Sequence, residues 1–589
     1  MLDGRGRTLT FCSQDGRELN LAVARQFHTI APVTRSLVQL VYLSLALAAA
    51  GATSPDTTMK SNEVVQVIRQ AISRAEQIEP LATIAIVDRE GFVLGVWSLD
   101  PDQTSLLARI KLVDAITKAG TASFLSSDQH AFTSRTAGFI VQQNFPPGIR
   151  NRPTGPLVGV NFSNMAFTDV NRFKNPHSGY VANGLSGING DPIVDPVSPL
   201  AALSGLAGSP GGVPLFRDGH LIGGIGVAGK TIAPRRSPFS ILDDIQVHQA
   251  YDPDEDVALA GQIGFQPANV FVGSHVFIDG IRVPYTKGRT RLGQLKDLGA
   301  VGVVFSPYTI TGSPDVEYPM AMFGGQLCKI RQPIIDDPIS GTLRGQDRLA
   351  SNEVAQILAL ASARAKITRA GIRLPRGQPS QNFITVVNNP GQTNTSPMVL
   401  GTIQTPGATL FSWDVAVQKA RTALFFSDDT RAFSTRTVGF LAQRFYPPGI
   451  VRTPPGPFYG MQERFSLLPR FDLLPFLGIT NLFGSNLPVT KLLVTNILNG
   501  VALEPDQVLA VPNPYLTNSI TVFPGGFPLY RNGVMIGAIG VSGDGIDQDD
   551  IIAAAGSVKF PAPGPIRADR MQYRGARLPY AKFPRNPDL

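Results

Sequence analysis

The stretch GGVPLFRDGHLIGGIGVAG, residues 211–229, is the most informative about the fold, because the chain contains it in two similar versions. Its second version is GGFPLYRNGVMIGAIGVSG, residues 525–543. In each version a short apolar run leads into Arg-Asp-Gly or Arg-Asn-Gly, and Asp-Gly and Asn-Gly favour the tight turns of hairpins. A second, glycine-rich apolar run follows directly. Each stretch therefore predicts two antiparallel strands, joined by a turn at residues 217–219 and at 531–533.

The rest of the chain repeats in the same order. The repeated pairs are SNEV at 61 and 351, KAGTA at 118 with KARTA at 419, AFTSRTAGF at 131 with AFSTRTVGF at 432, PPGI at 146 and 447, GPLVG at 155 with GPFYG at 456, and GIRVPYTK at 280 with GARLPYAK at 575. Repetition over this length indicates two large domains. We expect an N-terminal extension at 1–52, a first copy at 60–290, a connector at 291–350 and a second copy at 351–585.

The composition indicates a globular protein with many turns. Of 589 residues, 59 are Gly and 48 are Pro, while 16% are charged and 43% hydrophobic. This is too apolar for a disordered chain and too poor in charge for a coiled coil, and the glycines lack the period of collagen. The net charge of +8 comes with no basic motif interleaved with aromatic residues, so we expect no nucleic-acid partner. The two cysteines, Cys12 and Cys328, exclude a disulfide framework.

Both copies have the same predicted order of elements, α-β-β-α-α-β-β-α-β. Ser61 is placed to cap the first helix, and Glu63 suits its first turn. Residues 81–87 and 92–97 then predict two strands around a turn, and the corresponding runs of the second copy are 383–387 and 399–403. Strands that come as hairpins, with helices between them, indicate an α+β fold. We therefore expect two tandem domains, each an antiparallel sheet of roughly five strands with packed helices and a long insertion.

Residues 37–52, LVQLVYLSLALAAAGA, resemble a secretory signal peptide. The run follows Arg35, and Ala50-Gly51-Ala52 fits an A-x-A cleavage site. We therefore expect export, to the periplasm or the extracellular medium. A translation start at Val33 would explain the polar stretch before the run. The alternative is a single anchor helix, although a membrane span needs about 20 residues.

Residues 224–229 spell GxGxxG, the fingerprint of dinucleotide-binding folds. That fingerprint closes a strand and opens a helix, whereas here it lies inside the returning strand of a hairpin. The second copy also has Ala538 in place of the first glycine. We therefore exclude a dinucleotide site and expect these glycines where another backbone, or a flat ligand, approaches the strand closely.

Two polar pairs recur at helical spacing. Lys118 and Thr121 are one turn apart on a predicted helix, as are Lys419 and Thr422. One interpretation is a shared binding face. The other is that each Thr bonds the preceding turn while the Lys lies at the surface.

Arg135 and Arg436, each followed by Thr, also occupy corresponding positions. A guanidinium group can bind a carboxylate through two hydrogen bonds, so both are candidates for holding a small carboxylate. The alternative is that each Arg ties down a helix end or the Pro-Pro-Gly turn. The acids at 254–256 and 549–550 are candidates for a hard cation, although acids before an apolar run more often satisfy a helix N-terminus.

Catalytic signatures are missing from the sequence. It has no GxSxG, no HExxH and no repeated His or Cys, because His130 corresponds to Arg431 and His220 to Val534. A His-dependent reaction or a His-ligated metal shared by both copies is therefore excluded. We expect a non-catalytic protein.

Together these motifs resemble the GlcG/HbpS-like haem-binding domain family, some members of which are described as haem-degrading. The resemblance covers both copies. It rests on KAxTA, on GGxPL, on IGxIGVSG with an acidic helix start, and on a V-D-x-x-G turn at 87–91. It implies a compact α+β domain with a five-stranded antiparallel sheet, haem as the cofactor and assembly into homo-oligomers.

The candidate cofactor-binding residues are the positions that the resemblance covers together with the two arginines. They are Lys118, Thr121, Arg135, Gly226, Gly229, Lys419, Thr422, Arg436, Gly540 and Gly543. The resemblance does not indicate which side chain would meet the iron. The long insertions, 149–210 and 450–524, are expected to cover a pocket or to make an intramolecular contact between the copies.

Three functions are compatible with these patterns. The first is an exported tandem haem-binding protein that binds or stores its ligand. The second is a structural or interaction protein of the same fold without a cofactor. The third is a protein that binds a small carboxylate or another small anionic molecule through Arg135 and Arg436.

Overall fold

The computed structural model describes residues 56–141, 145–146, 149, 155–157, 207–229, 250–278, 280–306, 308–315, 318–371, 377–392, 397–459, 461 and 520–582. Apart from Asp56 they all belong to one compact unit, Thr57–Leu589. The expected signal segment and most of both insertions lie outside the described residues. Within the described ranges no helix is long and apolar enough to cross a membrane. Below, "first half" means the described residues up to 315, and "second half" those from 318 onward.

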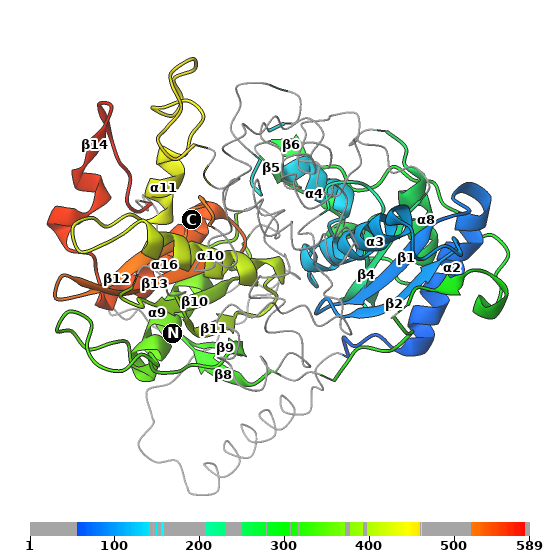
Figure 1. Ribbon diagram of the computed structural model, residues 1–589, viewed down its shortest axis with the longest axis horizontal. Coiled ribbons are helices and arrows are strands. Elements are labelled where there is room, and N and C mark those ends of the chain that lie inside the picture. The colour runs from blue at the N-terminus through cyan, green and yellow to red at the C-terminus, as the bar shows by residue number, and fades with distance from the viewer. Residues whose placement is uncertain are drawn as a thin grey trace, which may run out of the picture. The chain divides into compact units, whose positions relative to one another are not determined.

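The first half is built on an antiparallel sheet of five strands, in the order β3-β4-β1-β2-β7 (Figure 1). The strands are β1 (Thr83–Asp88), β2 (Val93–Ser98), β3 (Gly212–Arg217), β4 (His220–Ala228) and β7 (Val303–Val304). Asp218 and Gly219 form the turn between β3 and β4 with φ of 51° and 81°. Asp and Gly tolerate this left-handed region, which explains why Arg-Asp-Gly makes the turn.

The second half is built on an antiparallel sheet of six strands, in the order β12-β13-β10-β11-β9-β8. The strands are β8 (Met320–Phe323), β9 (Gln326–Gln332), β10 (Phe383–Asn388), β11 (Val399–Gln404), β12 (Gly526–Arg531) and β13 (Val534–Ser542). Its central register matches that of the first sheet: Phe383 pairs with Ser542 as Thr83 pairs with Ala228. The expected α+β class with antiparallel sheets is therefore confirmed.

Helices cover both faces of each sheet. In the first half they are α2 (Ser61–Ile78), α3 (Leu106–Phe124), α4 (Ser134–Ile140) and α8 (Pro253–Gly261). In the second half they are α9 (Ser351–Ile367), α10 (Phe411–Phe425), α11 (Thr435–Leu441) and α16 (Ile546–Gly556). Each half also contains a short two-stranded hairpin. In the first half it is β5 (Phe277–Ile278) with β6 (Ile281–Arg282), and in the second half β14 (Gln572–Tyr573) with β15 (Ala576–Arg577).

Alternate residues of the central strands point into two separate cores. In β1, Ile84 and Ile86 pack with Val64 and other residues of α2, while Ala85 and Val87 pack with residues of α3. Strand β10 does the same with α9 on one face and α10 on the other. Burying each such aliphatic side chain contributes roughly 1.5–3 kcal/mol, so both faces of each sheet stabilise the fold.

The recurrent glycines let a helix lie directly on the sheet. A Cβ added at Gly226 would lie 2.0 Å from the Ala115 carbonyl oxygen of α3, and one added at Gly540 would lie 2.0 Å from the Ala416 carbonyl oxygen of α10. The GxGxxG run lies within β4 and its end, as expected. The close neighbour of Gly226 and Gly540 is the helix backbone, so no ligand atom can take that space.

Residues 291–350 contribute strands to both sheets. Strand β7 pairs with β2 through Trp97 and Ser98, and β9 pairs with β11. Trp97 also donates its indole N–H to the Val301 carbonyl at 2.8 Å. This part of the chain was expected to be a connector. In addition, its strands form one edge of each of the two sheets.

The start of the first helix differs from the sequence-based expectation. The helix begins at Ser61, and the residue before it, Lys60, has extended backbone dihedral angles. The Glu63 carboxylate accepts a hydrogen bond from the Lys60 backbone N–H at 2.7 Å. The prediction that Ser61 caps this helix was therefore wrong, because Glu63 itself satisfies the exposed backbone donor.

Candidate functional site

Lys118 and Lys419 occupy corresponding buried positions at the end of the central hairpin. The Lys118 ammonium group donates to the Val227 carbonyl and to Asp254, both at 2.9 Å. The Lys419 ammonium group donates to the Val541 carbonyl at 2.9 Å and to Asp549 at 2.7 Å. Each lysine thus links its long helix to the last residues of a strand and to the acidic start of the next helix.

Lys118 has a further carboxylate partner one helical turn before it. Asp114, one turn before Lys118, places its Oδ2 atom 2.8 Å from the ammonium group, and both side chains are at most 4% exposed. Burial alone would lower the pKa of Lys118, but Asp114 and Asp254 outweigh it and hold that pKa above its ordinary value. The residue one turn before Lys419 is Val415.

The hydroxyl groups of Thr121 and Thr422 each make two hydrogen bonds to the backbone. The Thr121 hydroxyl donates to the Thr117 carbonyl at 2.7 Å and accepts from the Ala207 backbone N–H at 2.8 Å. The Thr422 hydroxyl donates to the Gln418 carbonyl and accepts from the Thr521 N–H at 3.0 Å. Both therefore anchor the chain as it approaches the Gly-Gly motif, and both bond the preceding turn as the structural alternative expected. That alternative also placed the two lysines at the surface, which is wrong because both are buried in ion pairs.

Arg135 and Arg436 are held by carboxylates of the chain itself. Arg135 is fully buried and binds Glu255 through two hydrogen bonds of 2.7 and 3.0 Å. Arg436 is partly exposed and binds Asp550 at 2.8 Å and Asp547 at 2.6 Å. The bidentate geometry expected of Arg135 is present, but the carboxylate is internal. Nothing here favours an external carboxylate as its partner.

The acids at the start of α8 and α16 serve as partners of basic side chains. Asp254 and Glu255 bind Lys118 and Arg135, and Asp256 binds Arg74 at 2.7 Å. Among the described residues no group of three or more His, Cys, Asp or Glu side chains is arranged to hold a metal ion. These acids thus act as counter-ions at helix N-termini.

Gly229 and Gly543 follow the last residue of the long strand in each half. A Cβ at Gly229 would lie 2.6 Å from a carboxylate oxygen of Asp254, and one at Gly543 would lie 2.1 Å from the Gln381 carbonyl. Both glycines therefore admit close packing of the neighbouring chain. As cofactor-binding residues, the ten candidates stay a prediction.

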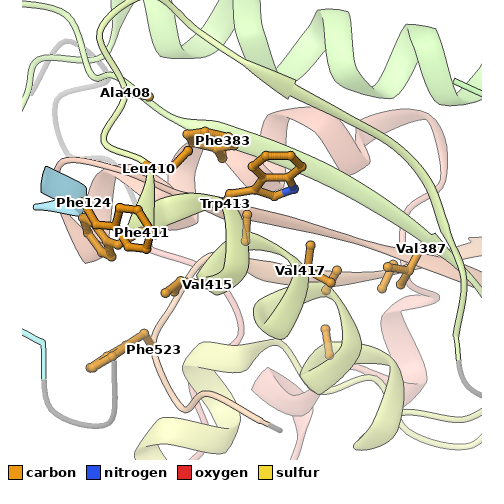
Figure 2. Packing of buried hydrophobic residues seen from close by; sticks show 14 of the residues in the cluster. Phe124, Phe383, Val387, Ala408, Leu410, Phe411, Trp413, Val415, Val417 and Phe523 are labelled. Carbon is orange, nitrogen blue, oxygen red and sulfur yellow. The ribbon is translucent and has the colours of Figure 1, made fainter. Parts of the chain in front are cut away.

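An apolar pocket lies beside Lys419 and Asp549. Its cavity volume is about 30 Å³, far below the roughly 300–1,000 Å³ of small-molecule sites. Its lining comprises Phe132, Ile140, Pro156, Leu157, Ile278, Phe411, Val415, Lys419, Phe523, Ser542, Gly543, Gly545, Ile546 and Asp549. Figure 2 shows Phe411, Val415 and Phe523 in the surrounding apolar cluster, with Phe124 beside Phe411. Of the candidate residues, the pocket brings together Lys419 and Gly543.

Comparison with known proteins gives one family match. Residues 376–557 match the model of the family described as haem degrading protein HbpS-like, which is less than half of the chain. No curated protein matches the sequence. The match spans β10 to the end of α16 and so includes both Lys419 and Asp549.

Two solved structures are similar at low identity. One is the crystal structure of a PduOC–haem complex, with 18% identity and a TM-score of 0.19, covering 35% of this chain and 94% of that one. The other is the Klebsiella pneumoniae protein ORFY, with 14% identity and a TM-score of 0.20, covering 36% of this chain and 94% of that one. Neither likeness is close enough to carry an argument about the site.

The pocket lining is mostly apolar, as a haem ring would require, but its cavity of about 30 Å³ is too small for that ring. Most of its walls are aliphatic or aromatic, and among the described residues that line it none is His, Cys, Met or Tyr, the usual axial ligands. Both ring nitrogens of His130 lie 2.9 Å from polar atoms of its own loop, Ser127 Oγ and the Leu125 carbonyl. Cys328 is buried, which raises the pKa of its thiol and disfavours the thiolate that binds metals.

Sequence reasoning missed the apolar walls of this pocket. Phe411 and Phe523 belong to no repeated motif, and Ile140 and Ile278 lie far from them in the sequence. One signal was available: at the repeat offset of KAGTA and KARTA, the counterpart of Asp114 is Val415. A charge replaced by a branched apolar residue beside a shared lysine points to a difference between the two sites.

Proposed function

We propose that this protein binds haem or a related tetrapyrrole and catalyses no reaction on it. The observation that carries the proposal is the match of residues 376–557 to the HbpS-like haem family. The apolar side chains beside Lys419, which lie largely within the matched region, are compatible with an apolar ligand. Haem supplies a flat apolar ring with two anionic propionates, and an iron for which the described lining residues offer no usual ligand.

In this proposal the side chains that line the pocket move apart to admit the ring and then pack on it. Phe411, Val415 and Phe523 present apolar atoms, and burying an apolar ring against them is favourable at roughly 25 cal/mol per Å². Lys419 and Asp549 form a charged pair at the edge of these walls. In this proposal they orient the ring by its polar edge and leave its faces to the apolar side chains.

We also propose that the chain consists of two copies of one domain in intramolecular contact. The matching strand registers and the recurrence of Lys118 with Asp254 as Lys419 with Asp549 support two copies. Two observations support the contact. Glu90 binds Arg331 of β9 at 2.7 and 3.0 Å, and one apolar cluster holds both Phe132 and Phe411.

Titration with haemin tests the proposed function. We expect a shift of the Soret band and quenching of tryptophan fluorescence, because Trp413 lies in the apolar cluster that includes pocket residues. Protoporphyrin IX without iron is expected to bind with comparable affinity, since no usual iron ligand is found among the lining residues that the structure describes. Haemin in buffer alone is the reference. The absence of any spectral or fluorescence change at stoichiometric haemin would refute the proposal.

A structural or interaction role is the second candidate, and one observation favours it. Strand β8 forms the edge of the six-stranded sheet, and its Met320 and Met322 are 52% and 64% exposed. Unpaired edges with exposed apolar side chains favour pairing with another chain. Stable homo-oligomers formed in the absence of haemin, together with no haemin binding, would favour this role.

Finally, we propose that the protein is exported, on the basis of residues 37–52. In protein recovered outside the cytoplasm, we expect the first residue to follow Ala52, at the A-x-A site. N-terminal sequencing measures this directly. Recovery of an N-terminus that retains residues 37–52 would contradict cleavage and favour an anchor.

A further inference from the structure

An open groove lies along one face of α2 in the first half, and it shares no described lining residue with the pocket beside Lys419. Its cavity volume is about 640 Å³, within the roughly 300–1,000 Å³ of small-molecule sites. The helix, drawn in blue in Figure 1, lines one side, and the apolar residues Leu295 and Ile310 also line it. The proposed function makes no use of this groove.

Hydrogen bonds hold both stretches of chain that cross α2 at the groove. One residue after Leu295, the backbone carbonyl accepts a hydrogen bond from Arg69 Nε at 2.8 Å. One residue after Ile310, the backbone N–H donates to the Leu94 carbonyl at 2.8 Å. The groove is therefore formed without a ligand, as small-molecule sites usually are.

Gln70, in the middle of α2, has a buried polar group without a partner. Its side chain lines the groove and is 6% exposed, and its Oε1 atom makes no hydrogen bond among the described residues. An unpaired buried polar atom is costly. The counterpart of Gln70 in α9, at the offset between the two SNEV motifs, is Leu360. Since the fold accepts an apolar residue here, packing does not explain the glutamine.

Two further carboxamides lie in line with Gln70. Asn62 and Gln66 precede it by eight and four residues, and both line the groove. Residues four apart share one face of a helix and lie about 6 Å apart along its axis. A carboxamide has both donors and an acceptor, as a hydroxyl group does, so this row suits a ligand that carries several hydroxyl groups.

The charge in the groove is already balanced. Among its described lining residues Arg69 alone is charged, and its Nη2 atom lies 3.1 Å from Asp297 Oδ1. An anion would have to compete with Asp297, and a cation would find no carboxylate in the described lining. Leu295 and Ile310 offer apolar contacts. The groove therefore favours a neutral ligand that has both hydroxyl groups and C–H faces.

The second half covers the corresponding face of its helix with its own chain. The counterpart of Arg69 in α9 is Ala359. A Cβ added at Gly324, in the turn between β8 and β9, would lie 2.3 Å from the Ala359 carbonyl oxygen. That turn therefore packs directly on α9 at the position where α2 borders the groove.

We propose that the groove on α2 binds a neutral, hydroxyl-rich molecule of oligosaccharide size. Asn62, Gln66 and Gln70 bond its hydroxyl groups, and Leu295 and Ile310 pack on the C–H faces of its rings. Rotation about the last side-chain torsion of Gln70, which is soft, turns either end of its carboxamide to the ligand. This function goes beyond haem binding and does not depend on it.

Saturation-transfer NMR on the full chain with maltotriose, cellotriose and xylotriose tests the site, with glucose 6-phosphate as the charged comparison. We expect at least one trisaccharide to bind and glucose 6-phosphate not to bind. Gln70→Leu should weaken that binding about tenfold or more, because it removes the buried hydrogen-bonding group. The same variant should unfold at the same or a higher urea concentration than the wild type, because an unpaired buried atom is lost. A purely structural Gln70 would instead lower that concentration.

Gln66→Leu tests the row on an exposed residue, where folding is retained, and should also weaken binding. Gln356→Leu, at the corresponding position of α9, is the matched control and should stay within about twofold of the wild type. The inference is overturned if none of the trisaccharides binds, if glucose 6-phosphate binds more tightly than they do, or if both Gln70→Leu and Gln66→Leu bind as the wild type does. Equal weakening by Gln356→Leu and Gln66→Leu would also overturn it. None of these results bears on haem binding.

Discussion

Replacing Gly540 with alanine is expected to lower the free energy of unfolding by about 3 kcal/mol, the upper range for overpacking of a core. The added Cβ would lie 2.0 Å from the Ala416 carbonyl oxygen and 2.5 Å from the Ala420 backbone nitrogen. Both neighbours are backbone atoms of α10, so no side chain can turn away to make room. Urea denaturation followed by circular dichroism measures the loss.

Gly564→Ala is the matched control for this prediction. An added Cβ at Gly564 meets no atom within 4 Å, so its effect should stay within about 0.5 kcal/mol. Comparing the two variants separates the effect of replacing a glycine from the effect of the steric clash that the added Cβ causes. Equal stability of the Gly540→Ala and wild-type proteins would show that α10 is not seated on β13 as described.

The fold could be predicted from the sequence because its signals are local and occur twice. The turn around Asp218 and Gly219 and the strands on either side follow directly from turn chemistry and apolar runs. The strands contributed by residues 291–350 could not be predicted in this way. The two-residue strand β7 and the short strand β8 depend on pairing with a sheet edge that only the folded chain provides.

The candidate site could be predicted only in part, for a physical reason. Lys118 and Lys419 were identified by repetition, and the structure gives each a buried carboxylate partner. Residues that are repeated in both halves are those that both halves require, and both halves require the buried lysine–aspartate ion pair for packing. The pocket takes walls from both halves, and an aromatic wall such as Phe523, which has Ser209 as its counterpart, leaves no repeated signal.

Replacing Arg135 with alanine is expected to cost about 3–5 kcal/mol of stability, the range for breaking a buried ion pair. Arg135 and Glu255 are both 0% exposed, and Glu255 also accepts a hydrogen bond from the Lys287 backbone at 2.7 Å. Removing the guanidinium group leaves the Glu255 carboxylate buried without its cation and removes the packing of the Arg stem. The midpoint of urea denaturation measures the change.

Two comparisons decide whether burial of the charge causes this loss. Arg431→Ala breaks the pair with Asp428, whose side chains are 58% and 39% exposed, and should cost less than about 1 kcal/mol. The double variant Arg135→Met with Glu255→Leu removes both charges and should recover most of the stability, because apolar residues of similar size often replace a buried pair without loss. If Arg135→Ala costs no more than Arg431→Ala, the Arg135 pair does not hold α4 to α8.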